Sequence, residues 1–198
     1  EFDWRSKGMV SDVKDQGHCG SCWAFGTTAT VESHAAIATG TLETLSTQQL
    51  VSCALNPLHC GGVGGCEGSI PEVAYNYIQL YGMTTEWMYS YSSYHGETGQ
   101  CSFNGTTTAS VVTIDGYRKI PSNSYHEVMA ALVRKGPLAI NVQANTWSDY
   151  ESGIFAGCSD MSNVDLDHVV QLVGYGSDAN KGHYWLVRNS WDATWGEN

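Results

Sequence analysis

Small and apolar residues recur with a helical period in the first part of the chain. The longest such stretch follows Ser21, a suitable N-cap residue, and stops at Gly40, a suitable C-terminal glycine. A second helix is predicted from Ser46, whose spacing to Gln49 is that of a capping box. The first helix is expected to bury Ala24, Phe25, Thr28, Val31, Ala35 and Ala36.

Two more helices are predicted further along. One runs from Ser69 to Gly82 and has Pro71 in its first turn, where the missing proline N–H costs nothing. The other begins at Ser124 and ends near Gly136. The first half of the chain is therefore expected to be mainly helical.

The pattern changes after these helices. Residues 138–144, 167–176 and 183–191 are rich in β-branched and aromatic side chains, which favours strands. Helices followed by strands predict an α+β fold class, and we expect two lobes with a boundary near residues 108–116.

The net charge of the chain argues against some classes of binding partner. Of the 198 residues, 42% are hydrophobic and 15% are charged, and the formal net charge is −11. A surface this acidic repels phosphate backbones and anionic membranes, so neither nucleic acid nor a membrane is expected as a partner. No apolar run approaches the length of a membrane span.

The cysteine content points to an oxidising compartment. An odd number of cysteines leaves at least one thiol unpaired. Asn104 opens an N-glycosylation sequon, Asn-Gly-Thr, which fits a secretory route. The seven cysteines are Cys19, Cys22, Cys53, Cys60, Cys66, Cys101 and Cys158.

Cys19 and Cys22 have only Gly20 and Ser21 between them, and this spacing has three interpretations. The pair could be a thioredoxin-like redox couple or one structural cysteine beside one reactive cysteine. It could also belong to a zinc site. The further zinc ligands would then be His18, His59 and Cys60.

The local pattern favours a reactive Cys22. No βαβ pattern follows the pair, and no second short cysteine pair appears that would complete a zinc site. If Ser21 caps the helix, Cys22 lies in its first turn, where unsatisfied N–H groups and the helix dipole favour an anion. Such a position lowers the pKa of a cysteine and favours the nucleophilic thiolate.

A thiolate nucleophile needs a base and a group that orients the base. His168 begins one predicted strand and Asn189 ends the next one. Adjacent strands would bring these two ends together, and an asparagine oxygen could then fix the imidazole tautomer.

Three blocks of the sequence resemble the papain family of cysteine proteases, in particular cathepsin L-like endopeptidases. The blocks read DWRSKGMVSDVKDQGHCGSCWAF, DHVVQLVGYG and NSWDATWGEN, and they occur in the order of that family. The resemblance covers essentially the whole chain. It implies a papain-like two-lobe fold, with a helical left lobe over residues 10–112 and a β-barrel-like right lobe over residues 113–198 plus 1–9. The active-site cleft would lie between the lobes.

The resemblance implies a role for each residue of the site. Cys22 would be the nucleophile, His168 the acid–base partner and Asn189 its orienting group. Gln16 would donate its side-chain amide to the oxyanion beside the backbone N–H of Cys22, and Trp191 would shield the histidine–asparagine pair from water. The implied disulfides are Cys19–Cys66 and Cys53–Cys101.

The resemblance also implies a substrate cleft that prefers a bulky apolar residue at P2. This chain departs from the family pattern at Ser69, where the family has a glycine, at Asn141, where it has a small or apolar residue, and in a longer loop before Cys66. The chain also stops before the family's last strand, which carries the usual partner of Cys158 and the bottom of the S2 pocket. The implied substrate-binding residues are Gly68, Ser69, Ile70, Pro71, Asn141, Leu166, Asp167, Val169 and Trp191.

By the same resemblance the partners are polypeptide substrates, the protein's own pro-segment and cystatin-like inhibitors. We expect a monomeric glycoprotein enzyme made as a zymogen, lysosomal, vacuolar or secreted, without a metal or other cofactor. Two other function classes fit the sequence less well. A noncatalytic papain-like binding protein would be expected to lose Cys22 or His168, whereas both are present. A disulfide oxidoreductase would need Cys19 and Cys22 to form a reversible pair.

Overall fold

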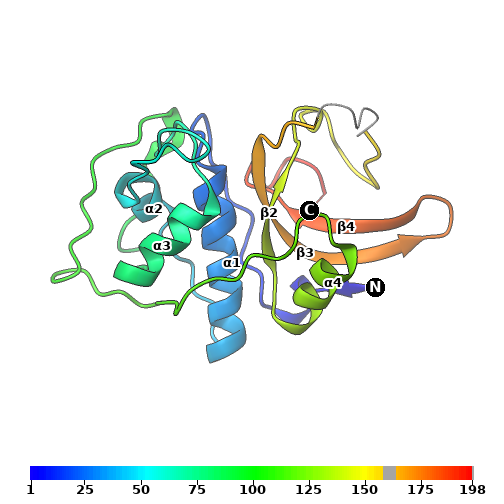
Figure 1. Cartoon of the computed structure of the whole chain (residues 1–198), viewed down its shortest axis with the longest axis horizontal. Coiled ribbons are helices and arrows are strands. Elements are labelled where there is room, and N and C mark those ends of the chain that lie inside the picture. The colour runs from blue at the N-terminus through cyan, green and yellow to red at the C-terminus, as the bar shows by residue number, and fades with distance from the viewer. Residues whose placement is uncertain (158–163, 198) are drawn as a thin grey trace.

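The computed structural model describes residues 1–157 and 164–197. Helix α1 (Cys22–Thr39) lies in the middle, between two short helices on one side and an antiparallel sheet on the other (Figure 1). We use "helical side" for α1–α3 and "sheet side" for the four strands with α4. The observed fold is α+β, as the order of patterns predicted.

Most of the surface of α1 is buried because α2 and α3 pack against one face of this helix and the sheet packs against another. Ser21 occupies the N-cap and Gly40 ends the helix with φ 78°, as predicted, although the Ser21 side chain makes no capping bond. Of the six positions expected to be buried, Ala35 alone is half-buried. Gly26 allows the sheet to come close, since a Cβ at this position would lie 2.6 Å from Cγ1 of Val169.

Two shorter helices complete the helical side. In α2 (Thr47–Cys53) the Ser46 hydroxyl accepts a hydrogen bond from the Gln49 N–H, which confirms the predicted cap. Helix α3 (Pro71–Tyr81) begins two residues later than predicted. Ile70, not Ser69, is its N-cap, because proline forces the residue before it into the extended region.

The core of the helical side is made by large apolar side chains from all three helices and the loops between them. Five of them have no exposed surface: Trp23, Leu45, Leu50, Ile78 and Met83. The disulfides Cys19–Cys66 and Cys53–Cys101 both lie on this side, which confirms the pairing that the resemblance implied.

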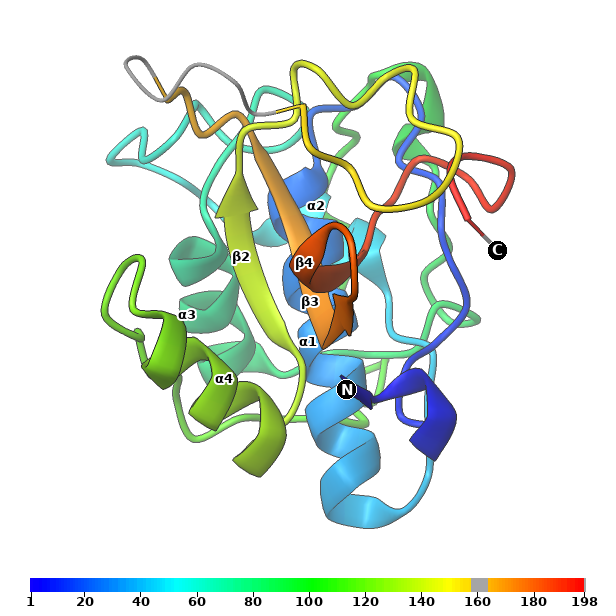
Figure 2. The same cartoon turned by 90° about the vertical axis from the view of Figure 1, so that its right-hand side faces the viewer.

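The sheet is built around β3 (His168–Asp178), which pairs antiparallel with the other three strands. These are β1 (Phe2–Asp3), β2 (Leu138–Val142) and β4 (Gly182–Arg188). Figure 2 shows the sheet in front of α1, with the N-terminal strand beside it. The predicted strands are confirmed, with β2 and β4 ending two to three residues early.

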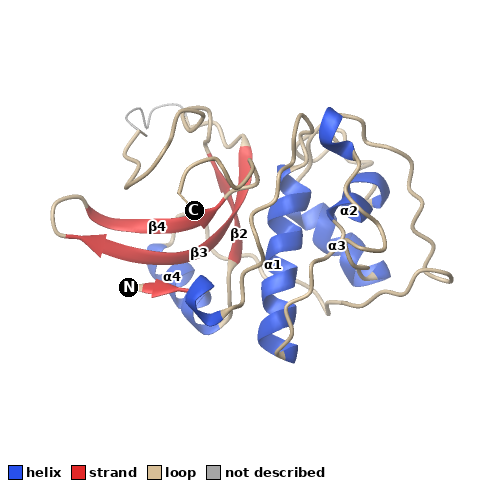
Figure 3. Ribbon diagram, turned by 180° about the vertical axis from the view of Figure 1, so that it is seen from behind, coloured by secondary structure: helices blue, strands red, loops and turns tan. Residues whose placement is uncertain are grey.

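Helix α4 (Tyr125–Arg134) contacts β3 on the sheet side and follows the predicted helix after Ser124. Figure 3 shows from behind that α1 lies between α2 and α3 on one side and the sheet with α4 on the other. Among the described residues, no helix is both long enough and apolar enough to cross a bilayer. The boundary between residues 112 and 113 stays a prediction.

Candidate active site

Cys22 lies at the N-terminal end of α1, against the beginning of β3. Burial raises the pKa of its thiol, the nearby Asp167 carboxylate raises it further, and the backbone N–H groups of Val169, Trp23 and Cys22 itself lower it. The expectation that the helix end would hold this pKa below its ordinary value is therefore wrong. Cys22 is half-buried, and the partial loss of hydration outweighs the favourable backbone dipoles.

His168 and Asn189 lie together at the adjacent ends of β3 and β4. The imidazole Nε2 is 2.7 Å from Oδ1 of Asn189, and both residues are buried. Because an amide oxygen only accepts hydrogen bonds, Nε2 carries a proton, and Nδ1 of the neutral ring is an acceptor. Burial lowers the pKa of His168, whereas the bond to Asn189 and the charge of Asp167 raise it.

The surroundings of this pair restrict access by water. The Trp191 ring lies over the His168 ring, with 4.9 Å between ring centroids and an interplanar angle of 34°. Asp167 is tied to the segment just after β2, since its Oδ1 accepts a hydrogen bond of 2.7 Å from the Ala144 N–H. His168 is thus fixed by a hydrogen bond on one edge and covered by an aromatic ring on one face.

Gln16 is held in the loop before α1 by bonds to both ends of its side-chain amide. Its Nε2 donates to the Cys19 carbonyl at 3.0 Å, and its Oε1 accepts from the Ser190 hydroxyl at 2.7 Å. The Gln16 N–H also donates to the Ser190 carbonyl. Only one of the two Nε2 hydrogens is used in these bonds, so Gln16 retains a fixed donor on the loop that leads to Cys22.

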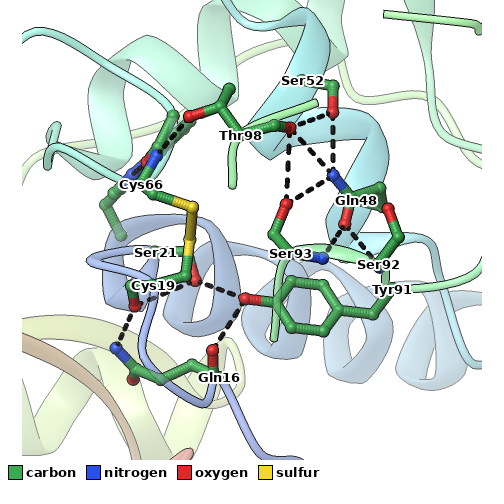
Figure 4. Close-up of a disulfide and its surroundings, with 12 residues drawn as sticks. Gln16, Cys19, Ser21, Gln48, Ser52, Cys66, Tyr91, Ser92, Ser93 and Thr98 are labelled. Atoms are coloured by element: carbon green, nitrogen blue, oxygen red, sulfur yellow. Dashed lines mark hydrogen bonds between the residues drawn. A yellow bond between two sulfur atoms is a disulfide. The ribbon is translucent and has the colours of Figure 1, made fainter. Parts of the chain in front are cut away.

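The structure decides between the interpretations of the Cys19–Cys22 spacing. Cys19 is bonded to Cys66, and Cys22 is a free thiol, so they are not a redox couple (Figure 4). His18, His59 and Cys60 do not form a metal site: within residues 1–157 and 164–197, no three metal-binding side chains gather. Cys60 is a free thiol, and Cys158 lies outside the described residues.

Residues expected to bind substrate on the helical side lie between the Cys19–Cys66 disulfide and α3. Gly68 has φ 84°, which favours glycine. The Ser69 side chain is buried, and its hydroxyl has no hydrogen-bond partner in the described part of the chain. Ile70 and Pro71 form the first turn of α3.

Residues expected to bind substrate on the sheet side lie at the start of β3 and on β2. Asn141 is directly opposite Val169 in the β2–β3 pair, so both side chains lie on one face of the sheet. Val169 packs against α1, whereas Asn141 is exposed. Leu166 precedes β3 with 61% of its surface exposed.

Two contributors to the site were missed from the sequence. Ser190 binds both the backbone and the side chain of Gln16. Tyr91 donates to the Gln16 carbonyl from 75 positions away. Ser190 lies within the quoted block NSWDATWGEN, but neither a serine nor a tyrosine in a loop has a periodicity that marks its partner.

Asn104 is exposed in a turn, and its Oδ1 accepts hydrogen bonds from the N–H and the hydroxyl of Thr106. The sequon is therefore accessible from solvent on the described surface.

A family model described as papain family cysteine protease matches residues 1–198. The thiol protease SEN102 of Hemerocallis sp. is 40% identical over 198 residues, which are 99% of this chain and 51% of that protein. The cysteine endopeptidase Rep1 of Oryza sativa subsp. japonica is 41% identical over 199 residues, covering 98% of this chain and 50% of that protein. The chain spans about half the length of the curated relatives it matches.

Solved structures show the same similarity. The bromelain protease from Ananas comosus in complex with the E64 inhibitor superposes with a TM-score of 0.85 at 40% identity, covering 98% of this chain and 84% of that one. The digestive procathepsin L 3 of Tenebrio molitor larval midgut gives a TM-score of 0.85 at 39% identity, covering 99% of this chain and 61% of that one.

Proposed function

Because the chain belongs to the papain family of cysteine proteases, we propose that it is a cysteine endopeptidase that cleaves polypeptides with Cys22 as its nucleophile. One observation carries the proposal beyond family membership. The buried His168–Asn189 hydrogen bond fixes an imidazole at the strand end that packs against the helix end bearing Cys22.

The reaction follows from these positions. His168 takes the Cys22 proton at Nδ1, and the thiolate sulfur attacks the scissile carbonyl carbon. The resulting oxyanion accepts hydrogen bonds from the Cys22 N–H and from Nε2 of Gln16. When the C–N bond breaks, His168 returns its proton to the leaving amine, which leaves a thioester on Cys22.

The second half of the reaction regenerates the enzyme. Water gives a proton to His168 and attacks the thioester carbonyl, the same donors stabilise the second oxyanion, and the C–S bond breaks. Cys22 takes the proton back from His168 as the carboxylic product leaves. Asn189 keeps the imidazole in one orientation throughout, because its oxygen accepts from Nε2 in the neutral and the charged ring.

Charge separation is the demanding step. Burial opposes both charges, since it raises the pKa of Cys22 and lowers the pKa of His168. The thiolate–imidazolium pair is therefore stabilised mainly by the attraction between its two members, which is strong in a dry site. Backbone N–H groups around Cys22 add to this stabilisation.

We expect a bulky apolar residue at P2 of the substrate. Ile70 and Pro71 would form one wall of its pocket, and Leu166 and Val169 the other. The Gly68 carbonyl already accepts a hydrogen bond from the Gly64 N–H. The Ser69 backbone beside it would therefore pair with the extended substrate chain, and Trp191 and Asp167 would border the cleft. Asn141 would add a polar group to an otherwise apolar wall.

The cellular context is proposed from the family as a whole. We expect a monomer that is made with a pro-segment, is inhibited by cystatin-like proteins and is lysosomal, vacuolar or secreted. Residues 10–112 and residues 113–198 with 1–9 would act as the two lobes. Asn104 would carry an N-linked glycan, for which its exposed turn leaves room.

Alkylation with iodoacetamide tests the assignment of the nucleophile. We expect peptide mapping to find rapid label on Cys22, with loss of peptidase activity in proportion to that label. Cys60 is a built-in control, because it is a free thiol on the same side of the molecule with no histidine assigned to it. Activity that survives complete labelling of Cys22, or that persists in a folded Cys22→Ser variant, would contradict the proposal.

A further inference from the structure

The Tyr91 hydroxyl connects the two ends of the loop that carries the proposed oxyanion donors (Figure 4). Its oxygen is 2.8 Å from the Gln16 carbonyl oxygen and 3.0 Å from the Ser21 hydroxyl. Gln16 carries one proposed donor, and Ser21 directly precedes Cys22, whose N–H is the other. The Tyr91 side chain therefore contacts both the residue that carries one donor and the residue directly before the other.

Proton counting sets the direction of these bonds. A carbonyl oxygen only accepts, so Tyr91 donates its one proton to Gln16. Ser21 is then the donor in its 3.0 Å contact with Tyr91, and the Cys19 carbonyl is a more distant acceptor for the same hydroxyl, at 3.5 Å. The result is a chain of two hydrogen bonds from Ser21 through Tyr91 to Gln16, in which each bond polarises the next. Burial raises the pKa of Tyr91, and the nearby Asp15 and Glu86 carboxylates raise it further, so the hydroxyl keeps its proton at working pH.

Tyr91 is itself held from several directions. Its ring meets Phe25 of α1 edge to face, with 4.9 Å between centroids. Its N–H donates to Glu86 Oε1 at 2.6 Å. The next two N–H groups, of Ser92 and Ser93, both donate to Oε1 of the buried Gln48 in α2. The hydroxyl therefore has a fixed position set by two helices.

From these contacts we propose that Tyr91 is a positioning residue for the oxyanion hole, one that sets the separation between the Gln16 side chain and the Cys22 N–H. The inference rests on the proposed endopeptidase function. Oxyanion stabilisation depends on donors fixed in advance, so a small displacement lowers turnover more than it lowers substrate binding.

Removal of the hydroxyl should leave the fold intact. The His18 N–H still donates to the Tyr94 carbonyl, and the Gln16 N–H still donates to the Ser190 carbonyl. The Phe25 contact needs the ring and not the oxygen. Tyr91→Phe is therefore the variant to test. Its matched control is Tyr89→Phe, which also removes a hydroxyl that donates to a backbone carbonyl, that of Gln100.

The experiment compares wild type, Tyr91→Phe and Tyr89→Phe with a fluorogenic coumarin amide that has phenylalanine at P2 and arginine at P1. We expect Tyr91→Phe to lower kcat by about tenfold, with KM within about twofold of wild type. A peptide aldehyde, whose hemithioacetal oxygen occupies the oxyanion position, should bind more weakly by a similar factor. The rate of Cys22 alkylation by iodoacetamide should not change, because that displacement forms no oxyanion.

Three other results would each overturn the inference, and they can be told apart. Unchanged kcat in Tyr91→Phe would show that the hydroxyl does not position the donors. An equal loss in kcat and in alkylation rate would place its effect on the nucleophile or on folding. A wild-type protein that is alkylated at Cys22 but hydrolyses no peptide would overturn the proposed function, and the inference with it.

Discussion

His168 Nε2 and Asn189 Oδ1 lie 2.7 Å apart in a buried site, although 21 positions separate the two residues in the chain. β3 and β4 are antiparallel neighbours whose pairing ends at Gln171 opposite Arg188, so Asn189 continues from β4 toward the start of β3, where its side chain reaches His168. The hydrogen bond fixes one tautomer of the imidazole. Burial lowers the pKa of His168, and the hydrogen bond raises it.

Asn189→Ala should therefore change both the rate and its pH dependence. General acid–base catalysis is worth about 10²–10⁴-fold, and the variant keeps the imidazole but loses its orientation, so we expect kcat/KM to fall roughly 10- to 100-fold. Without the bond, the protonated ring loses stabilisation, and the acid limb of the kcat/KM profile should move to lower pH. A variant with the wild-type acid limb would contradict this role, and Asn180→Ala in the exposed turn after β3 is the control.

The pH profile of the wild-type protein follows from the two opposite pKa shifts. The active pair holds one proton in total. Below the lowered pKa of His168 the pair takes up a second proton and becomes inactive. Above the raised pKa of Cys22 the pair loses its only proton. The bell of kcat/KM should therefore rise below the ordinary histidine value of about 6.5 and fall above the ordinary cysteine value of about 8.5.

Steady-state rates from pH 3.5 to 10 would check this profile, with tryptophan fluorescence to verify that the protein stays folded. A rate still climbing well above the ordinary cysteine value would mean that the thiolate acts without a protonated His168. An acid limb above the ordinary histidine value would mean that burial does not dominate the pKa of His168.

The sequence predicts some features of this molecule well for physical reasons. The limits of α1 are local, because Ser21 and Gly40 mark its ends within the same stretch of chain. The start of α3 is also determined locally, but the restriction that Pro71 imposes on Ile70 outweighs the preference of Ser69 for an N-cap.

Other features depend on contacts that no local pattern contains. The pKa of Cys22 is set by burial between α1 and β3, and burial is known only once both elements are placed. The bond from Tyr91 to Gln16 likewise joins segments 75 positions apart. The ends of two predicted strands single out His168 and Asn189 as candidates, and the resemblance of the neighbouring residues to a known family supplies their roles.

A buried carboxylate holds the two sides of the molecule together. Glu32 of α1 has no exposed surface, and its Oε1 is 2.6 Å from Lys14 Nζ and 2.8 Å from the Leu45 N–H. Its Oε2 accepts from the Ser11 hydroxyl and lies 3.9 Å from the Arg188 guanidinium of β4. Removal of this charge would leave two cations without their shared partner.

Glu32→Gln should lower the free energy of unfolding by about 3 kcal/mol, the low end for a broken buried ion pair, because the amide oxygen can still accept one hydrogen bond. Urea unfolding should show a lower midpoint with an unchanged slope. Glu72→Gln is the matched control, since its partner Lys119 is exposed and the pair should matter little. Equal effects of the two substitutions would show that the Glu32 cluster does not link the two sides.

Asn141 gives the last prediction, on substrate choice. It lies opposite Val169 on one face of the sheet and is exposed, so its amide would face the P2 side chain in the proposed cleft. An apolar P2 residue would strip water from this amide without replacing the lost hydrogen bonds, which weakens binding. Asn141→Val should remove that cost, and valine suits a strand position.

We expect Asn141→Val to raise kcat/KM for a leucine P2 substrate roughly three- to tenfold relative to a glutamine P2 substrate, below the usual effect of about 10- to 200-fold in a closed apolar pocket because position 141 is exposed. Both substrates should share P1 and the leaving group, so that the ratio isolates the P2 side chain. Asn180→Val makes the same exchange in the exposed turn after β3, and it should leave the ratio unchanged. An unchanged ratio in Asn141→Val would place this residue outside the P2 pocket. A fall in the leucine preference would mean that the amide assists apolar substrates, for instance by binding their backbone.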